Sequence, residues 1–304
     1  MNLRFVEAFY WVASLKSISR AAEKLFLTQS AMSSRISTLE EELGVLLLDR
    51  GDKQFKLTAA GARFLVYADK LLALQRDVKA EMGSDQHMAV SMRIGAIESV
   101  LHSWLIPWLE KLRSDHPGLE LELTVETTPI LMDLVQRGTL DVVFAALPAS
   151  STGVRNHTLP PMDMAFVGNP LLHKKRNYKL AELADMELLT FQKGSQPHVT
   201  LLDLFKKHRL EPKKVHAISS ISAMVQLVQG GFGVALLPLA AVARLGGFAK
   251  LKPFAVDANV QSLPIHASYR IDPTSDSVEV VVQSALAFTG GVKSYLKKTA
   301  KGKP

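Results

Sequence analysis

The sequence of 304 residues contains no cysteine. This absence excludes disulfides, thiolate metal sites, cysteine nucleophiles and thiol redox switches. No run of about 18 consecutive apolar residues occurs, so we expect no membrane-spanning helix. The first seven residues include an acidic side chain and lack the pattern of a signal peptide. We therefore expect a soluble protein of the cytoplasm with no membrane partner.

Motifs of catalysis are also missing. The sequence has no glycine-rich phosphate loop, no Gly-x-Ser-x-Gly elbow and no histidine pair at metal-binding spacing with a carboxylate. We therefore predict no catalytic residue, no cofactor and no metal, and we expect that the protein is not an enzyme.

The formal net charge of +7 is a weak indication of nucleic-acid binding, because much of it lies at the C-terminus. Five basic residues fall in the last twelve positions: Lys293, Lys297, Lys298, Lys301 and Lys303. Residues 1–60 hold eight basic and seven acidic residues, a net charge of only +1. Any DNA-binding function must therefore be inferred from where individual charges are placed.

The first part of the chain predicts three consecutive helices. Apolar residues spaced by three and four positions indicate a helix over residues 3–14. Either Ser17 or Ser19 can cap a second, short helix. Thr28 can cap a third helix that extends to about Leu43, and Gly44 is suited to end it.

The third helix and the segment after it have the chemistry of a DNA-reading unit. Short polar side chains and amides lie opposite the apolar face of the helix, and such groups recognise base edges in the major groove. Two short apolar runs, 45–48 and 55–57, flank a basic hairpin tip. A solvated polar face would explain the serines alone, but the whole succession favours DNA binding. The predicted contact residues are Thr28, Gln29, Ser30, Ser33, Ser34, Arg35, Ser37, Arg50 and Lys53.

A long helix is predicted from Thr58 to about Met82. Its apolar stripe, widened by two leucines, comprises Phe64, Leu65, Ala68, Leu71, Leu72, Val78 and Met82. A two-faced helix of this kind usually packs on a partner helix from another subunit. The polar segment 83–87 that follows is a hinge candidate.

From residue 92 onward, strands and helices alternate, which predicts an α/β module with parallel strands and a ligand crevice at their carboxyl ends. Hydroxyls and backbone amides at helix N-termini suit a carboxylate, so we predict an organic anion as ligand. Ser99, Thr128 and Ser195 are the strongest candidates, although each could simply cap its own helix. The full predicted set is Ser99, Thr127, Thr128, Leu147, Phe191, Ser195 and Ser220.

Glu98 is an unusual residue for a crevice that accepts anions. It would either face solvent or recognise a cationic group such as an amine. Phe191, His102 and His198 would line an aromatic site, unless the histidines serve the structure only.

Five segments together resemble the LysR-type transcriptional regulators: 19–25, 28–33, 39–44, 48–50 and 57–61. The similarity continues along nearly the whole chain. Ser30 stands where that family often has proline, and Leu48 where it often has phenylalanine. The first difference concerns the start of the recognition helix, and therefore base preference.

The resemblance implies a winged helix-turn-helix over residues 1–58, a linker and dimerisation helix with hinge over 59–86, and an effector-binding domain over 87–304 that is similar to periplasmic binding proteins. Subdomain I would comprise about 91–162 and 267–304, and subdomain II about 163–266. The implied partners are double-stranded promoter DNA, a small-molecule effector, further copies of the chain in a dimer and a tetramer, and RNA polymerase as a candidate.

Two other classes of protein are weighed against this one. An enzyme or a transport-binding protein on the same α/β module would need a convergent catalytic set or a secretion signal. A DNA-architectural protein would not need the roughly 210 residues of a two-lobed sensor.

Overall fold

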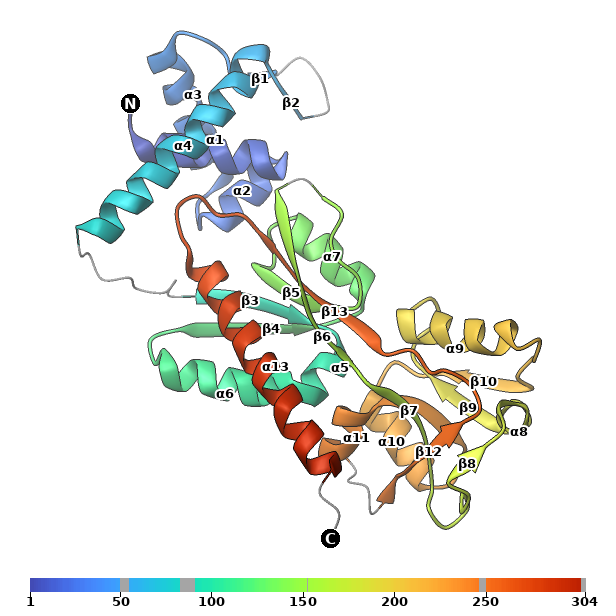
Figure 1. Ribbon diagram of the computed structural model, residues 1–304. Coiled ribbons are helices and arrows are strands. Elements are labelled where there is room, and N and C mark those ends of the chain that lie inside the picture. The colour runs from blue at the N-terminus through green and yellow to red at the C-terminus, as the bar shows by residue number, and fades with distance from the viewer. Residues whose placement is uncertain (50–54, 83–90, 152, 246–249, 302–304) are drawn as a thin grey trace.

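The structure is a computed structural model that describes residues 1–49, 55–82, 91–151, 153–245 and 250–301. Its N-terminal part is a helix-turn-helix followed by a two-stranded hairpin, as predicted (Figure 1). The elements are α1 (Leu3–Leu15), α2 (Ile18–Lys24), α3 (Gln29–Leu43), β1 (Leu48–Asp49) and β2 (Lys56–Leu57).

The helix boundaries follow from capping side chains. Of the two serines left open by the sequence, Ser17 caps α2 and accepts from the backbone N–H of Arg20 at 3.3 Å. Thr28 caps α3 in the same way, accepting from the N–H of Ala31 at 3.2 Å. Gly44 ends α3 in the left-handed region at φ 68°, where glycine has no steric penalty.

The hairpin is anchored to α3 by a buried carboxylate. Glu40 is only 4% exposed, and its Oε1 accepts from the N–H groups of Leu47 at 2.7 Å and Leu48 at 3.0 Å. Gly61, in the first turn of the next helix, lies so close that a Cβ there would be 2.1 Å from the carbonyl oxygen of Leu47. These contacts fix the hairpin on the helical core.

The long helix α4 (Ala59–Glu81) has two apolar surfaces rather than the single predicted stripe. Ala68 and Leu72 are buried against the chain's own helix-turn-helix, with Phe64 packed beside them. Other apolar side chains on α4 and just after it face outward, between 48% and 72% exposed: Val66, Tyr67, Leu74, Val78 and Met82. The first half of the predicted apolar stripe is thus covered by the chain's own domain and not by a helix of another subunit.

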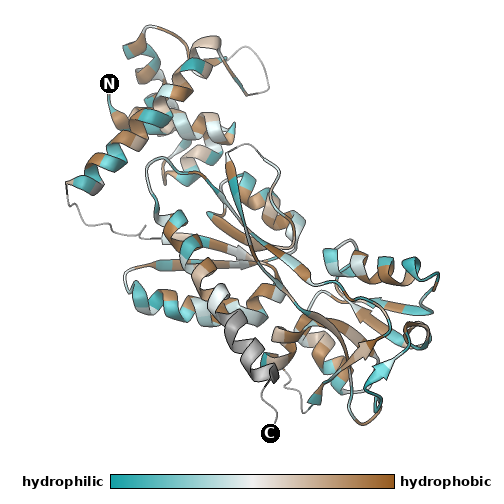
Figure 2. Ribbon diagram, viewed as in Figure 1, coloured by the Kyte–Doolittle hydropathy of each residue, from teal (hydrophilic) through white to brown (hydrophobic). Residues whose placement is uncertain are grey.

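The rest of the chain forms two α/β subdomains, each around one sheet (Figure 2 shows apolar residues in both their strands and their helices). Subdomain I has the strand order β4-β3-β5-β13-β6. Its strands are β3 (Ser91–Ala96), β4 (Glu120–Val125), β5 (Val142–Ala145), β6 (Val154–Met162) and β13 (Leu263–Arg270). The predicted all-parallel arrangement was wrong here, because β13 pairs antiparallel with both β5 and β6.

Subdomain II has the strand order β10-β9-β11-β7-β12-β8, and β7 is antiparallel to both of its neighbours. Its strands are β7 (Met164–Gly168), β8 (Asn177–Tyr178), β9 (Glu187–Thr190), β10 (Lys214–Ala217), β11 (Val234–Pro238) and β12 (Lys252–Val256). Two crossings join the subdomains: β6 continues into β7 at Asp163, and residues 257–262 lead from β12 to β13 (Figure 1).

Helices cover both sheets, and one of them is irregular. The segment η1 (Leu101–Leu105) is π-helical and precedes Pro107, whose missing N–H removes a hydrogen bond from the turn. The helices are α5 (Glu98–Val100), α6 (Ile106–Asp115), α7 (Thr128–Gln136), α8 (Leu180–Ala184), α9 (Gln196–Lys207), α10 (Ile221–Gln229), α11 (Leu239–Leu245) and α13 (Ser277–Lys301). In the described ranges, no helix is long and apolar enough to cross a membrane.

The helix-turn-helix domain is docked on subdomain I through a charged network. Asp141 at the start of β5 accepts from Lys24 Nζ of α2 at 2.7 Å and from the guanidinium and backbone N–H of Arg93. Arg270 at the end of β13 donates to the carbonyl oxygen of Ser14 at 2.7 Å. Asp141 and Arg270 are 9% and 7% exposed, so these polar contacts lie inside the interface.

Candidate functional sites

The N-terminal end of α3 presents a polar surface to solvent. Thr28, Gln29, Ser30 and Ser34 are exposed. The hydroxyls of Thr28 and Ser30 lie 3.0 Å apart, and Gln29 Nε2 donates to Ser19 Oγ at 3.0 Å. Sequence reasoning missed Ser19 as a member of this surface, because only the fold brings the start of α2 beside the start of α3.

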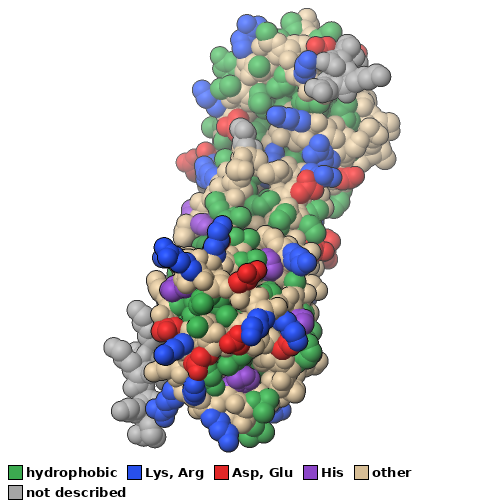
Figure 3. All heavy atoms as spheres, turned by 90° about the vertical axis from the view of Figure 1, so that its right-hand side faces the viewer, with side chains coloured by type: hydrophobic (Ala, Val, Ile, Leu, Met, Phe, Trp, Pro, Cys, Tyr) green, Lys and Arg blue, Asp and Glu red, His purple; other side chains and the backbone are tan. Residues whose placement is uncertain are grey.

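The remaining predicted DNA-contacting residues are placed differently. Ser33, Arg35 and Ser37 are half-buried on the flanks of α3. Arg35 lies near Glu7 of α1. Burial raises the pKa of Glu7 above its ordinary value, and the positive charge of Arg35 offsets part of that rise. Arg50 and Lys53, at the predicted hairpin tip, lie outside the described residues. Acidic and basic side chains are interspersed on the molecular face in Figure 3.

A cavity of about 340 Å³ lies between the two subdomains. It brings together six of the seven predicted effector residues; the seventh, Ser220, is not part of the lining, but its neighbour Ser219 is. The lining residues from subdomain I are Ile97, Glu98, Ser99, Val125, Glu126, Thr127, Thr128, Pro129, Ala146 and Leu147. Those from subdomain II are Phe191, Gln192, Gly194, Ser195, Gln196, Pro197 and Ser219.

Backbone N–H groups at helix starts contribute to the polar lining of this cavity, beside the carboxylates of Glu98 and Glu126. Three described helices begin at it without a hydrogen bond from a capping side chain, at Ile97, Thr127 and Ser195. Such ends carry unpaired N–H donors and a partial positive charge, which favour an anion. Thr128 Oγ1 accepts only weakly, from the N–H of Ala146 at 3.4 Å.

Ser195 is the most unusual of the lining residues. Its Oγ is buried and has no hydrogen-bond partner among the described residues. His198, one turn later on α9, likewise has an Nδ1 that is buried without a described partner, and burial followed by the charge of Lys193 lowers its pKa. Buried polar atoms without partners cost free energy, so these atoms are suited to meet polar groups of a ligand or water.

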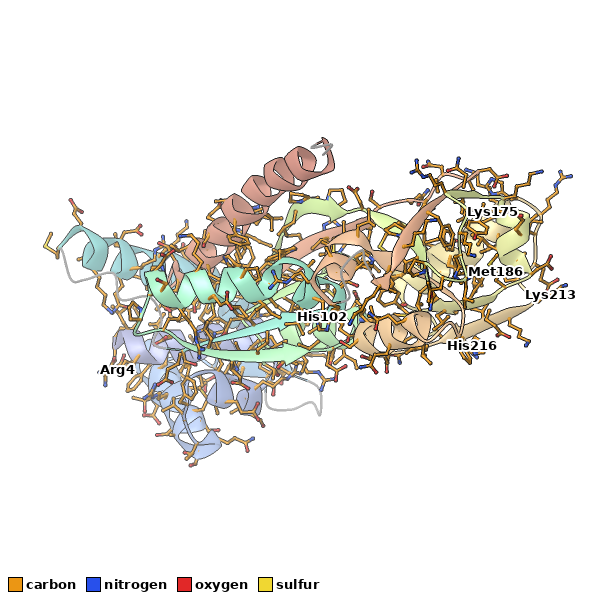
Figure 4. All side chains as sticks on the ribbon, turned by 90° about the horizontal axis from the view of Figure 1, so that it is seen from below. Arg4, His102, Lys175, Met186, Lys213 and His216 are labelled. Carbon is orange, nitrogen blue, oxygen red and sulfur yellow. The ribbon has the colours of Figure 1, made fainter. Side chains whose placement is uncertain are left out.

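Glu98 lines the cavity and also has partners within the chain that the sequence did not indicate. Its Oε2 accepts from the backbone N–H of Ile221 at 2.8 Å, and its Oε1 accepts from Ser220 Oγ at 3.2 Å. His102 Nε2 is 3.4 Å from Oε1, and Figure 4 shows His102 where helices of the two subdomains meet. Glu98 therefore spans the crevice from subdomain I to the start of α10.

Two family profiles match the chain and together span most of it. Residues 3–62 match the bacterial regulatory helix-turn-helix protein of the LysR family, and residues 86–288 match the LysR substrate binding domain. The second match alone covers well over half of the chain. The chain belongs to the LysR family of transcriptional regulators. It is a DNA-binding regulator with an effector-binding domain, and not an enzyme.

Two curated transcriptional regulators align over most of this chain. It is 30% identical over 246 residues to the transcriptional regulator BenM of Acinetobacter baylyi, covering 78% of this chain and 80% of BenM. It is 33% identical over 244 residues to a probable hydrogen peroxide-inducible genes activator of Mycobacterium avium, covering 78% of each.

Solved structures of LysR regulators share the fold. Full-length BenM superimposes with a TM-score of 0.55 at 25% identity, covering 95% of this chain and 98% of that one. Full-length OxyR from Pseudomonas aeruginosa gives a TM-score of 0.64 at 22% identity, covering 95% and 94%. CbnR in complex with its target DNA superimposes with a TM-score of 0.56 at 21% identity, covering 95% of this chain and all of that one.

Proposed function

We propose that this LysR regulator is controlled by a small organic anion bound in the crevice between its subdomains. The observation that carries the proposal is the convergence on one cavity of three helix starts without side-chain caps, together with the buried, unpartnered Ser195 Oγ. A cavity of about 340 Å³ suits a small molecule. Ser99, Thr128 and Ser195 are the proposed contacts of its carboxylate.

The test is a thermal-shift screen of the full chain against a panel of carboxylates and amino acids. We expect at least one monocarboxylate to raise the melting temperature in a saturable way, because a ligand that binds only the folded state stabilises it. The double variant Ser99→Ala with Thr128→Ala should lose that shift and keep DNA binding. A panel in which no carboxylate shifts the wild type, or shifts both proteins equally, contradicts the proposal.

The relative that activates peroxide-inducible genes suggests a second kind of signal, but this chain has no cysteine. A signal read by cysteine oxidation is therefore closed to it. A noncovalent ligand in the crevice fits the residues that are present.

For DNA reading, we propose that the exposed start of α3 meets base edges and that Arg50 and Lys53 contact the phosphate backbone. Gln29 can pair with adenine through its amide. Gln29→Ala should relax base preference, whereas Arg50→Ala and Lys53→Ala should weaken binding to all sequences alike. Footprinting on the promoter and on randomised duplexes measures both effects, and three variants with unchanged affinity and selectivity would contradict the assignment.

We also propose that residues 59–86 join two copies of the chain. The outward apolar side chains of α4 support this, since a monomer would leave them in water. Leu74→Glu and Tyr67→Glu should lower the mass of the assembly in light scattering. If both variants keep the mass of the wild-type assembly, whether that is a dimer or a tetramer, the proposed α4 interface is contradicted.

A further inference from the structure

A carboxylate of the chain itself occupies one helix start at the crevice. Glu98 extends from α5 in subdomain I, and its two oxygens accept from Ser220 Oγ and the N–H of Ile221, which open α10 in subdomain II. Ser220 also caps α10 by accepting from the N–H of Ala223 at 3.3 Å. The negative charge and acceptor capacity that a ligand carboxylate would bring to α10 are therefore already supplied.

The other helix starts at the cavity differ from α10 in this respect. The starts at Thr127 and Ser195 have no capping side chain, and α7 and α9 are 9 and 12 residues long. At the second of them, the buried Oγ of Ser195 has no described partner. The starts of α7 and α9, which the one proposed carboxylate would share through Thr128 and Ser195, thus remain open, whereas the start of α10 beside the cavity is already filled.

The charged side chains of the cavity disfavour a second negative group on the ligand. Its described lining includes two carboxylates, Glu98 and Glu126, and no lysine or arginine. The basic side chain nearest to Glu98 in the described contacts is His102, which faces that carboxylate already. A second ligand carboxylate near Glu98 would find no lysine or arginine in the described lining, and like charges at close range repel.

We propose that Glu98 is a specificity-determining residue: by filling the start of α10, it makes the crevice accept ligands with one carboxylate and reject those with two. This inference rests on the proposed function, in which an organic anion is the effector. It adds that the effector bears a single carboxylate.

The first test needs no knowledge of the effector. Glu98→Ala empties the start of α10, so sodium acetate should stabilise this variant, with a saturable rise in melting temperature of about 2 °C or more above sodium chloride at equal ionic strength. Acetate should raise the melting temperature of the wild type by less, because only the starts of α7 and α9 are open to it. Glu126→Gln removes a cavity charge without emptying a helix start, and should respond like the wild type. Equal acetate effects on all three proteins would overturn the assignment of Glu98 to an anion position.

The second test measures selectivity with matched probes, benzoate against phthalate and propionate against succinate. Titration calorimetry on the wild type should give the monocarboxylate at least about a tenfold advantage within any pair that binds. Glu98→Gln keeps the size of the side chain and loses its charge, so the ratio should fall towards one. Glu126→Gln should change it less. A wild type that binds a dicarboxylate as tightly as its partner overturns the proposal.

The two tests separate failure of this inference from failure of the proposed function. The proposed function fails if no carboxylate binds the wild type, or if the double variant Ser99→Ala with Thr128→Ala binds it equally well. In that case the acetate experiment alone decides the role of Glu98. If Glu98→Ala does not fold, acetate present during refolding should restore soluble protein. No recovery with acetate then counts against an anion position.

Discussion

The charged network between the helix-turn-helix domain and subdomain I predicts a large loss of stability when its central carboxylate is removed. Asp141 accepts four hydrogen bonds from cationic residues, one from Lys24 at 2.7 Å and three from Arg93 at 2.9–3.1 Å. Asp141→Ala removes the carboxylate that Lys24 and Arg93 share and leaves Arg93 with the carbonyl oxygen of Gly138; the two cationic side chains are 19% and 18% exposed. Removing one partner of a buried ion pair costs about 3–5 kcal/mol. We expect about 3 kcal/mol, since water reaches part of both cations.

Urea denaturation of the full chain measures this loss. The chain has three tryptophans: Trp11 reports on the helix-turn-helix domain, and Trp104 and Trp108 report on subdomain I. Asp133→Ala is the matched control, because its ion pair with Arg137 is 2.7 Å long but about half exposed. That control should lose at most about 0.5 kcal/mol. If Asp141→Ala loses no more than the control, the network does not stabilise the docked domain.

A related substitution separates docking from stability. Lys24→Met keeps the pair between Arg93 and Asp141 but cuts its link to α2, where Lys24 Nζ also lies 5.1 Å from the centre of the Trp11 ring. The unfolding transition seen by Trp11 should then move to lower urea than the one seen by Trp104 and Trp108. Transitions that still coincide would mean that other contacts, such as Arg270 with Ser14, hold the domains together.

Three further predictions follow from single contacts. Burial alone would raise the pKa of Asp141, but hydrogen bonds from Arg93 and the charge of Lys24 hold that pKa below its ordinary value. The stabilisation of the folded state by Asp141 is therefore present above the unfolded pKa of about 3.9 and is lost as the pH falls through the folded pKa. Asp141→Asn should flatten the fall in stability below pH 5, and a slope equal to that of the wild type would contradict this. Glu40→Ala should lower the free energy of unfolding of the helix-turn-helix domain by about 2–3 kcal/mol in urea denaturation, because the buried N–H groups of Leu47 and Leu48 lose their acceptor. Glu40→Gln keeps an acceptor and should lose clearly less, and equal losses for the two variants would count against this. Gly61→Ala should destabilise the protein by about 2 kcal/mol or more, because the added Cβ would meet the backbone carbonyl of Leu47. Gly290→Ala, in open space on α13, should stabilise it by up to about 1 kcal/mol. A higher melting temperature for Gly61→Ala than for Gly290→Ala would refute the close approach of Gly61 to Leu47.

Much of the N-terminal domain was predictable because its signals are local. A cap such as Thr28 or a C-terminal glycine such as Gly44 acts within one turn of helix, so the sequence determines where α3 begins and ends. The candidate crevice residues were predictable for a similar reason. Side chains that follow strands of an α/β module gather at one edge of the sheet, and Ser99, Thr128 and Ser195 lie at one cavity.

The errors lie where distant segments compete for the same surface. The predicted stripe on α4 assumed one partner, yet Ala68 and Leu72 are covered by the chain's own domain. The predicted parallel sheets missed the antiparallel return of β13, because strand direction is set by a crossing between subdomains and leaves no mark on hydrophobic spacing.

The sequence by itself thus determined the absence of thiol chemistry and the two ends of α3. Only the tertiary structure decided what those residues meet. Glu98 is the clearest case: as a letter in the sequence it was a carboxylate beside a predicted anion site, with no partner in view. The fold places it 2.8 Å from the N–H of Ile221, 123 residues away, where the start of α10 receives its charge. Pairing across that separation depends on how two subdomains close, which local patterns do not encode.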